Sequence, residues 1–205
     1  MTLYSPSRLF LRCNGGEYVA RNTRDAIVEA LIDLSLEHPY KSSFTMKEIA
    51  DRAGITRQSI YRKHFKNQGE IISYLRELVN RDVLKIYQEY DPNSRINPYL
   101  YVADHALPVF YQKRKMLRCL FSTSIDPLWH DFVMKTYFRW GAESLSPKRE
   151  MIAVASGQDM ISLLIGVTLS IIEVWICKEN PLPPDKFKEI FLKLVQTPFY
   201  DMLQV

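Results

Sequence analysis

At 205 residues, with 47% hydrophobic and 24% charged residues, the chain has the size and composition of a soluble globular protein with one large domain or two small ones. Its formal net charge of +4 comes entirely from residues 1–69, which hold 11 Lys and Arg against 7 Asp and Glu, as expected of a segment that contacts phosphate. The three cysteines, Cys13, Cys119 and Cys177, are odd in number and widely spaced, which excludes a disulfide framework and a Cys-x-x-Cys zinc site and favours free buried thiols in a reducing compartment.

Residues 1–20 are interpreted as an irregular N-terminal extension to which we assign no function, because Asn14-Gly15-Gly16 interrupts any helix. The apolar patch at residues 9–11 is too short for a secretory signal. Together with the cysteine usage, this favours a cytoplasmic location.

The first helix is predicted over residues 22–37. Its apolar positions Ile27, Ala30, Leu31 and Leu34 recur at helical spacing and form one stripe, while the opposite face is charged. The helix ends at His38-Pro39, because a residue before proline is restricted to extended conformations.

Residues 45–65 predict two short helices, 46–53 and 57–65, joined by a tight turn at Gly54. Glycine at this position can adopt the left-handed conformation that ends a helix. Two short helices with such a turn form the helix-turn-helix pattern, although an ordinary helical hairpin with a solvated charged face is the alternative.

Both helices of this motif begin with a capping residue. Thr45 and Glu48 have the spacing of a capping box, and Thr56 is placed to cap the second helix. No acidic residue occurs between Thr56 and Lys66, so the second helix is suited to lie against a polyanion. Its outward face carries Arg57, Gln58, Ser59, Arg62, Lys63 and His64.

The remaining chain reads as helical throughout, and the fold class is all-α with about nine helices. We expect a DNA-binding unit at residues 21–69, a connecting helix at 70–90, and a regulatory and dimerisation domain at 91–205. In the last of these, Pro108 is expected to kink or divide a helix that starts at Pro98. Further helices are predicted at residues 116–121, from Asp126-Pro127 to 144, from Ser146-Pro147 to Asn180-Pro181, and at 184–195.

One apolar run, residues 160–177, contains a single charge, Glu173, and approaches the length of a membrane span. No second span or basic loop supports this alternative. We therefore expect a helix buried by its own domain and a partner subunit, with Gly166 allowing close helix packing.

Residues 21–75 taken together resemble the TetR family of bacterial transcription regulators. The resemblance rests on the first helix, the Thr-x-x-Glu-Ile-Ala-x-x-Ala-Gly-Ile core, Arg57-Gln58-Ser59-Ile60-Tyr61, Phe65 and Ile71-Ile72. It implies that the helix at 57–65 lies in the major groove of DNA, where Arg pairs with guanine and Gln with adenine, while hydroxyls and Lys contact the backbone. The DNA-binding residues implied are Thr45, Lys47, Thr56, Arg57, Gln58, Ser59, Tyr61, Arg62, Lys63, His64 and Lys66.

Two departures from the family pattern concern the end of this helix. Tyr61 and Phe65 are four residues apart instead of three, so the helix is longer or wound differently there, which leaves the roles of Arg62, Lys63 and His64 open. Gln68 stands where the family commonly has a Lys that contacts phosphate, and either Lys66 or Lys63 is available to replace that contact.

The C-terminal domain is similar to the family only in outline, which implies an effector pocket and a dimer interface. The pocket candidates, for which a plain hydrophobic core is the alternative, are Phe110, Met116, Trp129, Tyr137 and Trp140. The family places the dimer interface on the last two long helices. The interface candidates are Ile161, Leu164, Ile165, Thr168, Ile172, Trp175, Phe187, Phe191 and Leu194.

These expectations combine into a sequence-specific DNA-binding regulator, most simply a ligand-responsive repressor that binds a palindromic operator as a homodimer. The alternative is a helix-turn-helix adaptor or co-activator whose C-terminal domain binds a protein partner. The expected partners are double-stranded DNA, a second copy of the chain and a small-molecule effector, with no membrane. We expect no enzyme, cofactor or metal site, because the histidines His38, His64, His105 and His130 have no Cys or acidic partner at a metal-ligand spacing.

Overall fold

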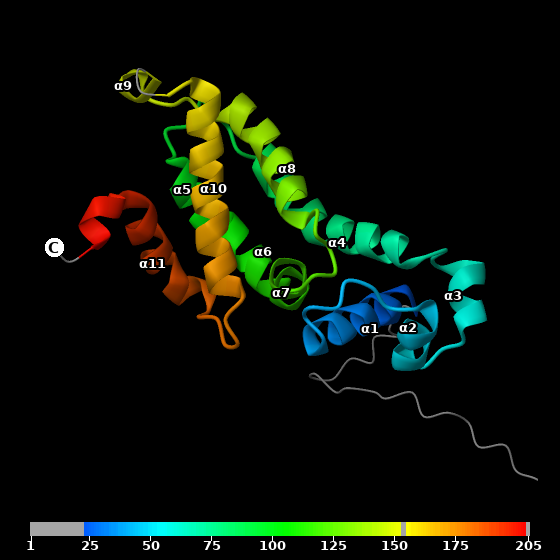
Figure 1. Ribbon diagram of the computed structural model, residues 1–205. Helices are drawn as coiled ribbons and strands as arrows, with labels where there is room; N and C mark the ends of the chain where they lie inside the picture. Colours follow the sequence, from blue (N-terminus) through cyan, green and yellow to red (C-terminus); the bar gives the residue numbers. More distant parts are fainter. Residues whose placement is uncertain (1–22, 153–154, 204–205) are drawn as a thin grey trace, which may run out of the picture.

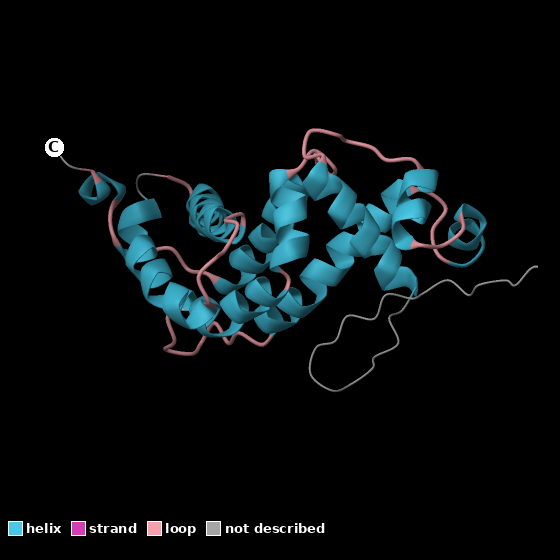
Figure 2. Ribbon diagram, turned by 90° about the horizontal axis from the view of Figure 1, so that it is seen from below, coloured by secondary structure: helices cyan, strands magenta, loops and turns pink. Residues whose placement is uncertain are grey.

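The computed structural model describes residues 23–152 and 155–203, and within them every regular element is helical (Figure 1). Helices α1 to α3 form a small unit at one end, and α5 to α11 form a larger one at the other (Figure 1). Coloured by secondary structure, the described chain consists of helices and the loops between them (Figure 2). The all-α prediction is confirmed, whereas the extension at residues 1–20 and Cys13 lie outside the described residues.

The small unit consists of α1 (Thr23–Glu37), α2 (Met46–Ala53) and α3 (Arg57–Lys63). Its core contains fully buried isoleucines and leucines from all three helices, including Ile27, Leu31, Ile49 and Ile60. α1 packs against α2, α4 and α7, so it supports the helix-turn-helix and also contacts the larger unit.

The connecting helix α4 (Gln68–Gln88) begins two residues before the predicted start at residue 70. Asn67 caps it by accepting a hydrogen bond from the Glu70 backbone N–H at 3.0 Å, and the Glu70 carboxylate accepts one from the Lys66 N–H at 2.7 Å. Its buried positions recur at helical spacing along five turns. They are Ile71, Leu75, Val79, Asn80, Val83 and Tyr87.

Of the two expected effects of Pro108, a kink or a division of the helix, the structure rules out the division. α5 (Pro98–Tyr101), the π-helical turn η1 (Val102–Ala106) and α6 (Leu107–Gln112) follow one another without a break. The Leu107 N–H donates to the carbonyl of Val102, five residues earlier. Because proline lacks an N–H and its ring crowds the carbonyl four residues before it, a widened turn accommodates Pro108 inside a continuing helix.

Next come α7 (Arg114–Ser122) and α8 (Trp129–Ser144), followed by α9 (Arg149–Ile152), α10 (Gly157–Ile176), α11 (Pro184–Gln196) and the 3-10 turn η2 (Phe199–Met202). The long apolar helix therefore starts at Gly157, and not at the Ser146-Pro147 boundary that the sequence predicts. A local cap marks this start: Ser156 accepts a hydrogen bond from the Asp159 N–H at 3.1 Å.

Within the described chain, the glycine at the close contact between two helices is Gly141 of α8, whereas close packing of a partner subunit at Gly166 of α10 stays a prediction. A Cβ atom on Gly141 would lie 2.7 Å from Cδ1 of Ile165 and 3.0 Å from Cγ2 of Ile161, both on α10. A Cβ atom on Gly166 would meet only the Met134 side chain, at 3.9 Å. α8 and α10 therefore approach closely at Gly141 and less closely at Gly166.

Among the described residues, α10 is the one helix that is long and apolar enough to cross a membrane, and a third of its most apolar 18-residue window is buried within the chain. α10 packs against α7, α8 and α11 (Figure 1). Its length and composition are also those of the core helix of a soluble protein.

Candidate functional site

The helix-turn-helix begins with the predicted capping box at the start of α2. The Thr45 hydroxyl accepts from the Glu48 N–H at 3.2 Å, and the Glu48 carboxylate accepts from the Thr45 N–H at 2.7 Å. Lys41 also donates to Glu48 at 2.6 Å. Hydrogen bonds from Lys41 and from the Thr45 backbone lower the pKa of Glu48 to about 2, so the carboxylate that holds this cap is ionised at neutral pH.

The turn orients α3 through backbone geometry. Gly54 has a φ of 70°, and its N–H donates to the carbonyls of Ala50 and Asp51, so α2 ends with a left-handed residue that glycine adopts without a steric penalty. The Thr56 hydroxyl accepts from the Ser59 N–H at 3.1 Å, and Ile60 is fully buried. These contacts fix the inward side of α3 and leave the opposite side outward.

The outward side of α3 carries the residues predicted to meet DNA. Thr56, Arg57, Gln58, Tyr61, Arg62 and Lys63 are exposed, and Ser59 is half-buried. The Arg57 guanidinium lies 5.8 Å from the centre of the Tyr61 ring, which holds the two side chains on one surface. Lys47 on α2 and Lys66 after α3 are exposed as well. The result is a basic surface on a short helix, a shape and charge that suit the major groove of DNA.

The extra residue between Tyr61 and Phe65 is accommodated at the end of α3. The helix stops at Lys63, two residues before the predicted boundary, and the N–H groups of His64 and Phe65 both donate to the carbonyl of Ile60, at 2.9 and 3.1 Å. This widened last turn carries Phe65 into the core, while Lys63 remains exposed and His64 half-buried. The Arg24 guanidinium covers the Phe65 ring at 4.7 Å.

Gln68 makes a connection that the sequence did not reveal. Its side-chain oxygen accepts from the Phe44 N–H at 2.6 Å, and its side-chain nitrogen donates to the Ser42 carbonyl at 3.2 Å. Both bonds join the first residue of α4 to the segment just before the Thr45 cap. Gln68 is thus used inside the chain, and it fixes the start of α4 relative to the start of α2.

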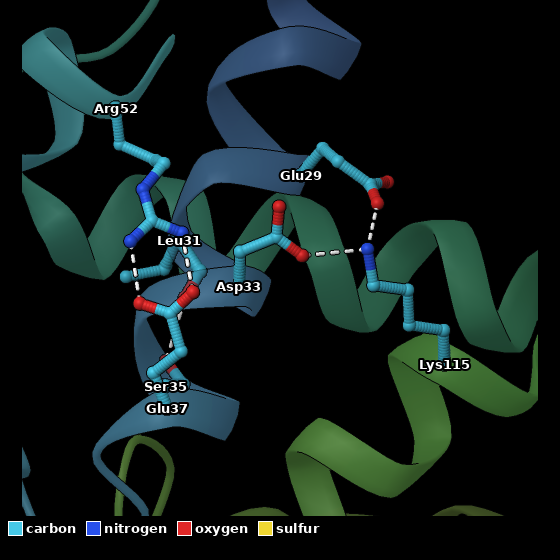
Figure 3. Close-up of polar contacts among 7 residues, drawn as sticks. All are labelled: Glu29, Leu31, Asp33, Ser35, Glu37, Arg52 and Lys115. Carbon is cyan, nitrogen blue, oxygen red and sulfur yellow. Dashed lines mark hydrogen bonds and ion pairs between the residues drawn. The ribbon is translucent and has the colours of Figure 1, made fainter. Parts of the chain in front are cut away.

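Ion pairs connect the small unit and α4 to the larger unit. Lys115 of α7 lies between Glu29 and Asp33 of α1, with 2.6 Å separating its nitrogen from the Asp33 carboxylate (Figure 3). Within the small unit, Arg52 of α2 bonds Glu37 of α1 (Figure 3). The acids of α1 raise the pKa of Lys115 against the opposing effect of burial.

A second ion pair lies deeper. Arg76 of α4 forms a bidentate pair with Asp126, the residue before Pro127, with 2.6 Å between the Arg76 Nε and one carboxylate oxygen. The Asp126 side chain is 3% exposed. The pair ties the middle of α4 to the segment that leads into α8.

The larger unit contains a cavity of about 150 Å³ bounded by α4, α5, η1, α8, α10 and the segment that follows α8. Its aromatic walls are Tyr87 of α4, Tyr99 of α5, and Tyr137 and Trp140 of α8, and α10 contributes Leu164 and Thr168. Every side chain that lines it is uncharged. Such a mostly apolar cavity with a few hydroxyl groups is typical of a small-molecule site.

Of the five predicted pocket residues, Tyr137 and Trp140 line this cavity. The other three lie elsewhere: Phe110 and Trp129 are buried in the helix core, and Met116 of α7 packs against that core. Trp129 contacts Phe121 and Phe132. An aromatic residue in a helical sequence marks a buried face, but the sequence does not reveal which buried faces leave a space between them.

The predicted dimer-interface residues mostly face the interior of their own chain. Ile161, Ile165, Ile172, Trp175, Phe187 and Phe191 are buried within the single chain, and Leu164 and Thr168 line the cavity. Leu194 is half-buried. The outward stripe of α10 consists of other residues, at spacings of three and four. They are Leu163, Gly166, Val167, Ser170, Ile171 and Val174.

Within the described residues, no three His, Cys, Asp or Glu side chains gather as a metal ion would require. Cys119 is buried and Cys177 half-buried, and burial raises the pKa of both thiols to about 11. These thiols are therefore protonated at neutral pH and unreactive as nucleophiles.

Comparison with known proteins gives matches to both units. Residues 27–75 match the sequence model of a family described as "Bacterial regulatory proteins, tetR family". The HTH-type transcriptional regulator AlkX of Mycobacterium tuberculosis is 34% identical over 70 residues, which cover 34% of this chain and 33% of that protein. The chain thus spans about a third of the length of this curated relative.

Among solved structures, the fold is similar to that of NalD, the secondary repressor of the MexAB-OprM multidrug efflux pump in Pseudomonas aeruginosa. The TM-score is 0.53 at 20% identity, over 85% of this chain and 95% of that one. A TetR family repressor AlkX from Dietzia sp. aligns with a TM-score of 0.35 at 19% identity, over 89% and 100% of the two chains. The NalD likeness extends the match from the helix-turn-helix to the arrangement of the larger unit.

Proposed function

We propose that this chain, which belongs to the tetR family of bacterial regulatory proteins, is a repressor that binds a palindromic operator as a homodimer and releases it when a small molecule occupies the cavity. Regulators of this family act by binding and not by catalysis, which agrees with the expectation that the chain is no enzyme.

The exposed face of α3 is the observation that carries the proposal. Arg57 and Gln58 stand at the first turn of a capped helix, where they are suited to bond guanine and adenine edges in the major groove. Tyr61 and Lys63 lie one turn further on and are suited to contact phosphate. Thr45 at the start of α2 would have to turn its hydroxyl proton from Glu48, 2.8 Å away, to a phosphate oxygen.

The outward stripe of α10 supports the homodimer. Leu163 and Val174 are 58% and 67% exposed, so the apolar surface of α10 continues outside the part that its own domain buries. Between them, Gly166 and Ser170 are small enough to let a second helix approach closely, and they line a surface groove. A homodimer with a two-fold axis would present one α3 helix to each half-site of a palindromic operator, with half-sites about 34–36 Å apart or a multiple of that distance.

Control by a ligand is supported by the course of α4. Its last turn provides Tyr87 to the cavity, and its first residue, Gln68, is bonded to the segment that precedes α2. A ligand that displaces the cavity end of α4 would therefore change the position of the helix-turn-helix. To act as an inducer, the ligand must bind more tightly to the conformation that does not fit the operator than to the conformation that fits it.

The DNA-binding proposal is tested with the DNA upstream of the protein's own gene, in fluorescence anisotropy at several salt concentrations. We expect tight, salt-sensitive binding, and we expect Arg57→Ala to cost about 1–3 kcal/mol, concentrated at one base position. Arg139→Ala, which removes an exposed arginine of α8, is the matched control and is expected to bind normally. Equal effects of the two substitutions would contradict the role of α3.

The homodimer is tested by light scattering. Leu163→Glu places a charge in the outward stripe of α10 and is expected to give monomers, whereas Leu128→Glu alters a leucine that is 61% exposed outside it and is expected to leave the dimer intact. A wild-type chain that is monomeric alone and dimeric or larger only with another protein would favour the adaptor alternative.

A further inference from the structure

The direction of α3 depends on how the chain enters and leaves this short helix. α3 packs mainly against α2, and its inward anchors are Ile60, which is fully buried, and Phe65, which follows the helix and is 2% exposed. Because α3 is only seven residues long, these two anchors leave its angle open to change. Gly54 fixes the entry from α2, so the exit into α4 is the remaining point of control.

Gln68, the first residue of α4, restrains this exit. Its Oε1 accepts from the Phe44 N–H at 2.6 Å, and its Nε2 donates to the Ser42 carbonyl at 3.2 Å. A carboxamide presents an acceptor and a donor side by side, so it pairs with this backbone as another peptide group would. A lysine could only donate and a carboxylate could only accept, so neither side chain can make both bonds.

These two bonds, the Gln68 clamp, close a ring around the helix-turn-helix. Residues 44–68 contain α2, the turn and α3, and the two ends of this segment meet at the clamp. Both ends are also fixed in other ways: Phe44 is 5% exposed and precedes the Thr45 cap of α2, and Asn67 caps α4. α3 is therefore carried by a segment whose ends cannot move apart while the clamp is intact.

Gln68 differs from a residue that contacts phosphate. Its side chain carries no charge, and both of its polar atoms are bonded to backbone groups of the chain. We propose that Gln68 is a positioning residue for DNA recognition: the clamp holds α3 at the angle at which Arg57 and Gln58 meet the bases, and Gln68 itself contacts no DNA. This role rests on the proposed function of α3.

The test compares Gln68→Met, which keeps the length of the side chain without its polar atoms, with Gln88→Met at the exposed last residue of α4. Anisotropy at several salt concentrations gives the affinity for the DNA upstream of the protein's own gene and for an unrelated duplex of the same length. When α3 samples other angles, specific affinity falls with the fraction of molecules that remain competent. We expect Gln68→Met to lower the ratio of specific to non-specific affinity roughly three- to thirtyfold, with an unchanged salt dependence, and Gln88→Met to change neither.

Gln68→Lys separates positioning from charge. The lysine can reach a phosphate, but it cannot accept from the Phe44 N–H, so we expect the ratio to stay as low as in Gln68→Met. A lysine variant that restores the ratio would show that residue 68 acts through charge, and so would a Gln68→Met variant whose salt dependence is weaker by the slope of about 0.9 that one phosphate contact contributes. Either result overturns the proposal. It is also overturned if Gln68→Met melts at a lower temperature but keeps the wild-type ratio, since the clamp then stabilises the fold without positioning α3.

Hydrogen exchange of the full chain without DNA tests the clamp independently of operator binding. We expect Gln68→Met to speed the exchange of backbone amides in α2 and α3, relative to wild type and to Gln88→Met, and to leave α8 and α10 unchanged. Unchanged exchange in α2 and α3 overturns the clamp even where the wild type binds its operator. A wild-type chain that binds neither duplex removes the proposed function, and the recognition role of Gln68 with it, even where exchange shows the clamp.

Discussion

Replacing Arg76 with Gln removes one partner of the most deeply buried ion pair in the described chain. Asp126 would then keep a charge on a side chain that is 3% exposed, with a backbone hydrogen bond from Leu128 at 3.3 Å as its remaining contact. Removing one partner of a buried pair typically costs about 3–5 kcal/mol. Since the Arg76 side chain is 21% exposed and water can partly replace it, we expect the lower end, about 3 kcal/mol. For a chain of this length, that corresponds to a melting temperature about 6–12 °C lower.

The assay is thermal and urea unfolding at a fixed protein concentration, because the stability of the proposed dimer would depend on concentration. Arg81→Gln is the matched control on the same helix, since Arg81 is exposed and pairs only with its neighbour Asp82, at 3.5 Å; it should change stability by less than about 0.5 kcal/mol. The double variant Arg76→Gln with Asp126→Asn removes the stranded charge and should be more stable than Arg76→Gln alone. If Arg76→Gln is as stable as Arg81→Gln, the pair does not hold α4 to the larger unit.

Two further predictions concern the cap of α2 and the contact of α8 with α10. The pKa of Glu48 is lowered from 4.5 to about 2, so the stabilisation that its carboxylate gives the fold is complete above pH 4.5 and is lost as the pH falls towards 2. In acid unfolding followed by circular dichroism, the stability difference between wild type and Glu48→Gln should therefore disappear over this pH range. A difference that stays constant with pH would contradict this prediction. Gly141→Ala places a methyl group against Ile161 and Ile165, which should lower the free energy of unfolding in urea by about 1–3 kcal/mol. The higher helix propensity of alanine offsets up to about 1 kcal/mol of this loss. A variant more stable than wild type would show that α10 can shift away from α8 at little cost.

Local features of the fold were predictable because their partners lie within a few residues. The capping box of Thr45 and Glu48 and the cap of Asn67 on Glu70 both span three residues, and both are present. The left-handed turn at Gly54 follows equally from one residue type at one position. These features fix the helix-turn-helix, which is why the sequence was most informative there.

Contacts between distant residues were not predictable by the same means. Arg76 and Asp126 are 50 positions apart, and Gln68 and Phe44 are 24 apart, so no helical period relates either pair. The sequence suggested that Gln68 was merely a lost phosphate contact, because only the local alternatives for its side chain were visible. Its two bonds to the segment before α2 depend on how α4 and α2 approach each other.

The outward face of α10 was mispredicted for a physical reason. The helix is apolar on almost every side, so its hydrophobic pattern has no polar face to mark the direction of solvent. Ile165 and Leu163 are both large aliphatic residues of the same helix, so the sequence does not distinguish them. Ile165 nevertheless packs over Gly141, whereas Leu163 is exposed. Only the position of α8 separates an inward residue from an outward one.

The same absence of a polar face bears on how the proposed homodimer would be built. If α10 buries one side in its own domain and the other in a second copy, a charge introduced on either side would be buried, and its own acids, Asp159 and Glu173, lie near its two ends. α4 is under a different constraint: Glu77, Arg81 and Lys85 are exposed, Arg76 pairs with the buried Asp126, and the buried residues run in one stripe from Ile71 to Tyr87. Because the helix is unbroken, we expect a displacement at Tyr87 to be transmitted along α4. We infer that the bidentate pair of Arg76 with Asp126 is the pivot of that displacement. On this view, weakening the pivot alters stability and ligand response together, whereas weakening the Gln68 bonds separates ligand binding from DNA release.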